Sequence, residues 1–97
     1  MEPEDCQTMA DVRAGVDALD DQLVSLLGVR VRFMEAAARI KPDRAAVRDE
    51  PRKAFVIAHA RQVAAREGVP PDLVGELYET LVEGCIAYEF DRFDATR

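Results

Sequence analysis

The chain has 97 residues, of which 48% are hydrophobic and 33% are charged, and its 13 basic and 19 acidic residues give a net charge of −6. This apolar content can build a core, so we expect one folded domain over residues 1–97 rather than a disordered chain. The acidic balance argues against nucleic acid or an anionic membrane as the main partner, because both favour clustered positive charge. No apolar stretch is long enough to span a bilayer and the opening MEPEDC is acidic, so we expect a cytoplasmic protein.

The cysteines and the single histidine restrict the possible chemistry. Cys6 and Cys85 lie far apart without C-x-x-C spacing, so neither a zinc site nor a disulfide framework is indicated, while a single disulfide stays open. His59 is the only histidine, which removes a histidine-based metal cage, and we interpret it as a partly buried packing residue. We therefore expect no metal, no cofactor and chemistry that needs no nucleophile.

The first predicted element is a long helix over residues 9–41, a segment without proline. Apolar residues recur there at spacings of three and four, Thr8 can cap the start with Asp11 three residues on, and Pro42 ends the run. At about 1.5 Å per residue this helix is roughly 50 Å long, whereas a compact domain of this size has a radius of gyration of about 13 Å. The helix needs an apolar partner outside its own domain, so we expect a homodimer.

Two shorter helices are predicted over residues 50–67 and 71–93. Asp49 followed by Glu50 and Pro51 is typical of a helix start, and Gly68 of a helix end. The second helix has its apolar face on Val56, Ile57, Ala60, Val63 and Ala64, and the third on Leu73, Val74, Leu77, Leu81, Val82, Cys85, Ile86, Phe90 and Phe93. No segment shows strand alternation, so we predict an all-α fold with one long and two shorter helices.

Four charged residues occupy positions that a purely structural helix would leave apolar. Arg30 falls in the apolar series of the first helix, Arg13 and Lys41 flank that series, and Glu89 lies on the apolar stripe of the third helix. Arg30 can turn towards solvent, pair with a buried acid or face an anion in a pocket. Arg13 lies about 25 Å along the helix from Arg30, so only the Arg13 of a partner chain, in an antiparallel dimer, could share a small ligand with Arg30.

Other charged or polar candidates have an equally good structural explanation. Arg52 and Lys53 follow the start of the second helix and can be solvated first-turn charges. Cys85 fits a small apolar core position. Arg44 and Arg48 are interpreted as solubilising charges of the loop between the first two helices.

Four stretches occur in order along the chain: ADVRAGVDALDDQLVSLLGVR, AARIK, VRDEPRK and CIAYE. In this combination the sequence resembles the all-helical chorismate mutases, including the branch that contains isochorismate pyruvate lyases. The resemblance implies an intertwined homodimer of three-helix chains with two equivalent sites, each completed by the first helix of the other chain. It also implies a small dianionic substrate, chorismate or isochorismate.

The resemblance assigns roles around the bond that breaks. Arg13 of the partner chain and Arg30 would bind the substrate carboxylates, and Lys41 would contact the ether oxygen. Glu89 holds a position where a glutamine usually donates to that oxygen. An ionised carboxylate there would repel the developing charge, so Glu89 must be protonated to donate, and activity should fall as pH rises. Alternatively, Glu89 pairs with Lys41 and shapes the pocket for a different isomer.

Further site residues would lie on the ring side of the substrate. Asp49 and Arg52 would line the ring hydroxyl, and Cys85 holds a position that is often small and polar. Lys53 stands where many mutases carry a glutamate near that hydroxyl, which leaves isochorismate open as the substrate. The segment EDC followed by ADVR also looks like the lyase branch.

The expected function is therefore that of a chorismate mutase of the shikimate pathway, which supplies aromatic amino acid biosynthesis. The main alternative is an isochorismate pyruvate lyase that produces salicylate and pyruvate. A lesser alternative is a mutase acting on an amino analogue of chorismate. From a different class, a non-catalytic helical dimerisation module could hold Arg30 and Glu89 in buried ion pairs between chains.

Overall fold

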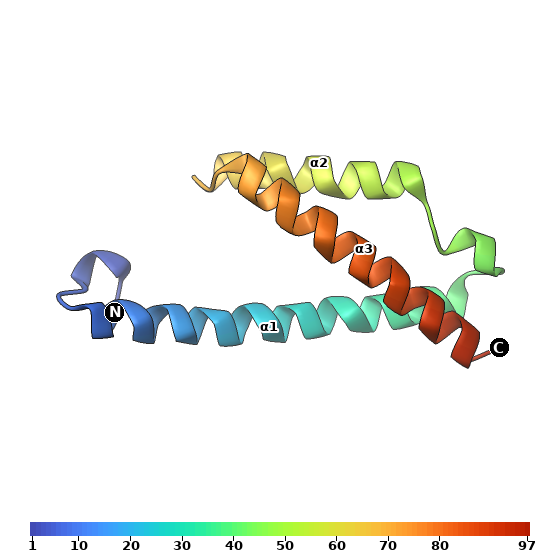
Figure 1. Ribbon diagram of the computed structural model, residues 1–97, viewed down its shortest axis with the longest axis horizontal. Coiled ribbons are helices and arrows are strands. Elements are labelled where there is room, and N and C mark those ends of the chain that lie inside the picture. Colours follow the sequence, from blue (N-terminus) through green and yellow to red (C-terminus); the bar gives the residue numbers. More distant parts are fainter. The chain divides into compact units, whose positions relative to one another are not determined.

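The computed structural model describes residues 1–97 and contains helices without strands (Figure 1). The elements in chain order are η1 (Pro3–Asp5), α1 (Met9–Ile40), η2 (Arg44–Ala46), α2 (Glu50–Arg66) and α3 (Pro71–Ala95). The all-α prediction is confirmed, and each long helix begins at the predicted residue. No helix is both long and apolar enough to cross a membrane. The residues form two compact units, Met1–Phe33 and Met34–Arg97.

In the first unit, the start of α1 is fixed by reciprocal caps. The Asp11 N–H donates to Thr8 Oγ1 at 3.1 Å, and Asp11 Oδ2 accepts from the Thr8 N–H at 3.2 Å and the Gln7 N–H at 3.0 Å. The bond from Gln7, followed by those from Thr8, lowers the pKa of Asp11. This exchange satisfies amides that have no partner within the helix, and it confirms the predicted cap at Thr8.

The apolar side chains of the first unit lie largely at the surface. Leu23 and Leu26 expose 57% and 66% of their surface, and Val12, Val16, Leu19 and Phe33 are also exposed. Apolar surface gathered along one helix is characteristic of an interaction site. The apolar spacing that predicts the helix therefore also predicts a surface able to pack against another molecule.

The second unit is built on α2 and α3, which lie side by side and run in opposite directions (Figure 1). Gly68, with φ of 74°, ends α2 in the left-handed conformation that glycine adopts without strain, as predicted. The core consists of Ala38, Val47, Val82, Ile86 and Phe93, with Val56, Ile57, Tyr78 and Phe90 packed against it. The end of α1, the following loop and both later helices thus share one core.

Cys85 and His59 were both expected to contribute to packing, and the structure confirms this for Cys85 only. Cys85 is buried, as predicted for a small core residue. The expectation for His59 is wrong, because this residue is exposed and its ring stacks on Phe55 with the ring centres 5.9 Å apart. The buried face of α2 contains Ala60 and Ala64. His59 precedes Ala60, and neighbouring residues of an α-helix point about 100° apart, so its side chain lies off that face.

Candidate active site

The centre of the candidate site is a contact between Lys41 and Glu89. Lys41 directly follows α1, and its N–H still donates to the Ala37 carbonyl at 2.9 Å. Its Nζ lies 2.7 Å from Glu89 Oε2 and donates to the Val47 carbonyl at 3.2 Å. The Glu89 contact is an ion pair rather than an aligned hydrogen bond, since no donor meets hydrogen-bond geometry at that oxygen. The ammonium is therefore held between α3 and the loop that follows α1.

Glu89 is the one buried charged residue of the structure, with 4% of its surface exposed. Burying a carboxylate is unfavourable unless a cation or hydrogen-bond donors compensate it, and the Lys41 ammonium supplies that compensation. Cys85 lies four residues earlier on α3 and is also buried, so both side chains belong to the same helix face. The pair thus combines a fixed positive charge with a carboxyl group shielded from water.

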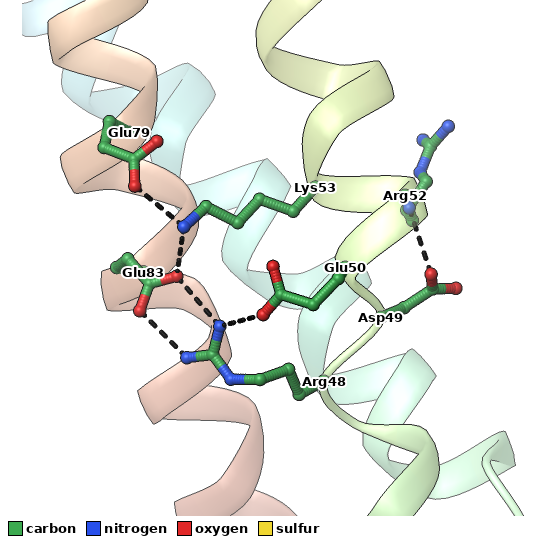
Figure 2. Close-up of polar contacts among 7 residues, drawn as sticks. All are labelled: Arg48, Asp49, Glu50, Arg52, Lys53, Glu79 and Glu83. Atoms are coloured by element: carbon green, nitrogen blue, oxygen red, sulfur yellow. Dashed lines mark hydrogen bonds and ion pairs between the residues drawn. The ribbon is translucent and has the colours of Figure 1, made fainter.

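Asp49 and Arg52 meet at the start of α2 (Figure 2). Asp49 Oδ1 accepts a hydrogen bond from the Arg52 N–H at 3.0 Å, which confirms the predicted helix cap. The Arg52 guanidinium lies over the Phe55 ring, 5.2 Å from its centre.

Lys53 belongs to an ion-pair network that joins the start of α2 to α3 (Figure 2). Its Nζ lies 2.7 Å from Glu79 Oε1 and 2.8 Å from Glu83 Oε2. Arg48 donates to both carboxylate oxygens of Glu83, at 2.8 and 3.1 Å, and to Glu50 at 2.8 Å. We call these five residues the Glu83 network.

The Glu83 network shifts the ionisation of its members. Hydrogen bonds from Arg48 and then Lys53 lower the pKa of Glu83 to about 2. The carboxylates of Glu79 and Glu83 raise the pKa of Lys53, and those of Glu83 and Glu50 raise the pKa of Arg48. All of these shifts favour the charged forms, so the network stays ionised at neutral pH.

The loop arginines were expected to be solubilising charges, and both are exposed, but each also pairs with an acid on α3. Arg48 binds Glu83, while Arg44 Nε donates to Asp94 at 3.0 Å and its guanidinium lies 4.5 Å from the centre of the Phe90 ring. Both guanidiniums therefore fasten the loop after α1 to α3. The spacing of Asp and Glu along α3 is the sequence signal for such contacts, but it does not specify which arginine each acid meets.

The two arginines expected to bind the substrate carboxylates, Arg13 and Arg30, lie in the first unit, on α1. Arg13 is exposed and Arg30 is partly buried. Of the expected site residues in Met34–Arg97, the structure brings Lys41 and Glu89 into contact and places Cys85 one turn away from Glu89. The described residues contain no group of three or more His, Cys, Asp or Glu side chains that could hold a metal ion.

A family model described as chorismate mutase type II matches residues 12–90. The chain belongs to the type II chorismate mutases. An isochorismate pyruvate lyase from Pseudomonas aeruginosa is 30% identical to it over 95 residues, which cover 98% of this chain and 94% of that protein. The resemblance seen in the sequence is thus confirmed, and the protein is an enzyme of this family.

The segment that matches the type II chorismate mutase model includes every candidate site residue from Arg13 to Glu89. Sequence reasoning did not identify the Val47 carbonyl that binds the Lys41 ammonium. Backbone acceptors leave no side-chain signature, so only the conformation of the loop reveals this contact. The Glu83 network was also missed, although Glu79 and Glu83 stand four residues apart on one helix face.

Proposed function

We propose that this protein is a chorismate mutase that converts chorismate to prephenate. The observation that carries the proposal is the Lys41–Glu89 pair, with its 2.7 Å contact in a site where Glu89 is buried. In the reaction an ether C–O bond breaks while a C–C bond forms within one molecule, so the enzyme supplies neither nucleophile nor co-reactant. Its tasks are to hold the enolpyruvyl arm over the ring and to stabilise negative charge on the ether oxygen.

Lys41 is suited to stabilise that oxygen. An ammonium has three N–H donors; one is directed to the Val47 carbonyl and the ion pair engages the face towards Glu89. A third donor remains for the ether oxygen of the substrate. Because two protein groups already fix the ammonium, its orientation is set before the substrate arrives, which is the condition for effective electrostatic catalysis.

Glu89 acts as a second donor to the same oxygen when it carries a proton. An ionised carboxylate at this place would repel the charge that develops as the C–O bond breaks. In the free protein Glu89 lies against Lys41, and this donor role requires the protonated form of Glu89 in the substrate complex. The proposal therefore predicts activity that falls as pH rises.

Arg30 and the Arg13 of a second chain bind the two carboxylates of the substrate. A guanidinium forms two parallel hydrogen bonds with a carboxylate, and two such groups match a dianion. The proposal requires a homodimer, which is supported by the exposed apolar side chains of α1, among them Leu23 and Leu26. A second copy of the chain would cover this surface and bring its own Arg13 to the site.

The ring side of the substrate is assigned to Asp49, Arg52, Lys53 and Cys85. Asp49 uses Oδ1 for the helix cap, and its second oxygen can accept a hydrogen bond from a ring hydroxyl. The ion pairs of Lys53 with α3 hold the first turn of α2 in place. These four residues would select the position of the hydroxyl group on the ring.

Isochorismate pyruvate lyase is the second candidate function. It is favoured by the 30% identity to a protein of that name over nearly the full length of both chains. The lyase reaction breaks the same kind of ether bond and leaves salicylate and pyruvate, so it can use the same cations. The two functions differ in which isomer of the substrate the ring side accepts.

Incubation of the purified protein with chorismate and, separately, with isochorismate tests the proposal. Prephenate from chorismate supports the mutase, and salicylate from isochorismate alone supports the lyase. No turnover of either, together with no binding of a bicyclic transition-state mimic, overturns both and leaves a helical dimerisation module. Arg30→Ala should abolish turnover while its circular dichroism spectrum stays helical, and Arg32→Ala, at an exposed position on the same helix, is the matched control.

A further inference from the structure

We propose that Arg97 is a positioning residue for Lys41, an inference that rests on the proposed function. Arg97 follows α3, and its Nη2 donates to the Lys41 carbonyl at 2.8 Å and to the Ala38 carbonyl at 3.0 Å. The Arg39 carbonyl lies further away, at 3.4 Å. Since Nη2 carries two hydrogens, the two short contacts account for both donors.

The contacts of Arg97 compensate for a missing amide at the end of α1. In a continuing helix, the N–H of residue 42 would donate to the carbonyl of Ala38, but residue 42 is proline and has no N–H. Ala38 is 1% exposed, so its carbonyl needs a partner within the protein. Arg97 provides that donor and places a positive charge at the negative end of the helix dipole.

Arg97 itself is held in a defined place. Its guanidinium lies 4.1 Å from the centre of the Phe93 ring, and Phe93 belongs to the core. Thr96 ends α3 by donating from its N–H to the Arg92 carbonyl at 3.1 Å and from its hydroxyl to the same carbonyl at 2.9 Å. Figure 1 shows that the C-terminus of the chain lies beside the end of α1.

As a result, Lys41 is fixed at both ends. Arg97 holds its carbonyl, while the Val47 carbonyl and Glu89 hold its ammonium. Without Arg97 the peptide between Lys41 and Pro42 loses its restraint, and the ammonium moves relative to Glu89. The arginines proposed to bind the substrate carboxylates belong to the first unit, whereas all the contacts of Arg97 lie in the second, so the loss should affect the chemical step more than substrate binding.

A first experiment observes Lys41 without relying on turnover. The chain has two lysines, Lys41 and Lys53, so the side-chain nitrogens of ¹⁵N-lysine-labelled protein give two assignable ammonium signals. Arg97→Ala should shift the Lys41 signal and leave the Lys53 signal in place. Arg97→Lys adds a third ammonium signal, and it should return the Lys41 signal towards its original position, because lysine keeps a cation near Phe93 and a donor for the carbonyls. A Lys41 signal unchanged in Arg97→Ala overturns the inference.

A second experiment measures kinetics with whichever substrate is turned over. Arg97→Ala should lower kcat by roughly 10- to 100-fold, the range expected when a catalytic group is slightly misplaced, with KM changed by less. In a Lys41→Met background, the same substitution should have no further effect on the residual rate. An equal loss in both backgrounds shows that Arg97 does not act through Lys41 and overturns the inference. Arg66→Ala, at the exposed end of α2, is the control.

The two experiments separate the inference from the proposed function. A shifted Lys41 signal in a protein that converts neither substrate upholds the positioning role and contradicts the proposed reaction. If Arg97→Ala does not fold, Arg97→Gln is the replacement, because its amide keeps a donor for the Ala38 carbonyl but lacks the charge. The Lys41 signal should still shift in this variant, and a signal identical to the original overturns the inference.

Discussion

Removing one charge from the Lys41–Glu89 pair should have unequal effects on stability. At 2.7 Å and an effective dielectric constant of about 20, the gross attraction between the two charges is about 6 kcal/mol. Desolvation of the ions offsets several kcal/mol of this, so the intact pair contributes little net stability. The side chain of Glu89 is 5% exposed and that of Lys41 is 27% exposed. An unpaired Glu89 carboxylate therefore destabilises the fold more than an unpaired Lys41 ammonium.

Lys41→Met leaves the buried Glu89 carboxylate without its cation, and the expected loss in the free energy of unfolding is about 3–5 kcal/mol. Glu89→Gln leaves an ammonium that reaches solvent, the Val47 carbonyl and the new amide oxygen, so its expected cost is about 1–2 kcal/mol. The double variant contains no orphaned charge. It should therefore be more stable than Lys41→Met alone.

Urea unfolding followed by far-UV circular dichroism at pH 7 measures these differences. Protein concentration must be the same for all variants, since dimer formation adds to apparent stability. A cost for Glu89→Gln that equals or exceeds that of Lys41→Met would refute the reasoning. So would a double variant less stable than Lys41→Met.

Three further predictions concern the Glu83 network, the proposed interface and the pH profile. The pKa of Glu83 is lowered to about 2, so its ionised form stabilises the fold fully above the ordinary value of 4.5, and this stabilisation is lost as pH falls towards 2. The melting temperature should therefore fall less steeply between these pH values in Glu83→Gln than in the parent protein. Equal declines in melting temperature would contradict the network. Sedimentation should give a dimer of the 10.8 kDa chain, and Leu23→Glu should shift it to monomer, whereas a monomeric parent protein rejects the interface. Turnover should fall as pH rises, with a flatter profile for Glu89→Gln; superimposable profiles would rule out a protonated Glu89.

The fold was predictable to the extent that its signals are local. Thr8, Asp49 and Gly68 act through hydrogen bonds or backbone angles within a few residues, so the helix limits follow from the sequence almost directly. The all-α class follows from apolar spacing. These features do not depend on how one helix crosses another.

The candidate site was predictable only in part. The positions of Lys41 and Glu89 on apolar faces indicate that both side chains turn inward, but their contact depends on how α3 meets the end of α1. The same dependence hides the Glu83 network, where several acids and bases offer alternative pairings. Arg97 could not be identified from pattern at all, because its partners are backbone carbonyls about 60 positions earlier, among them the Ala38 carbonyl that Pro42 leaves without a helical donor.

The central claim is that the Lys41 ammonium stabilises charge on the ether oxygen of the substrate. Its most direct test is the rate of prephenate formation at saturating chorismate by Glu89→Gln and by the double variant Lys41→Met/Glu89→Gln, which differ only in that ammonium. The account predicts a kcat roughly 100- to 1,000-fold lower for the double variant, as expected for loss of one preorganised donor. Rates that agree within a few-fold, with both variants folded, would contradict it.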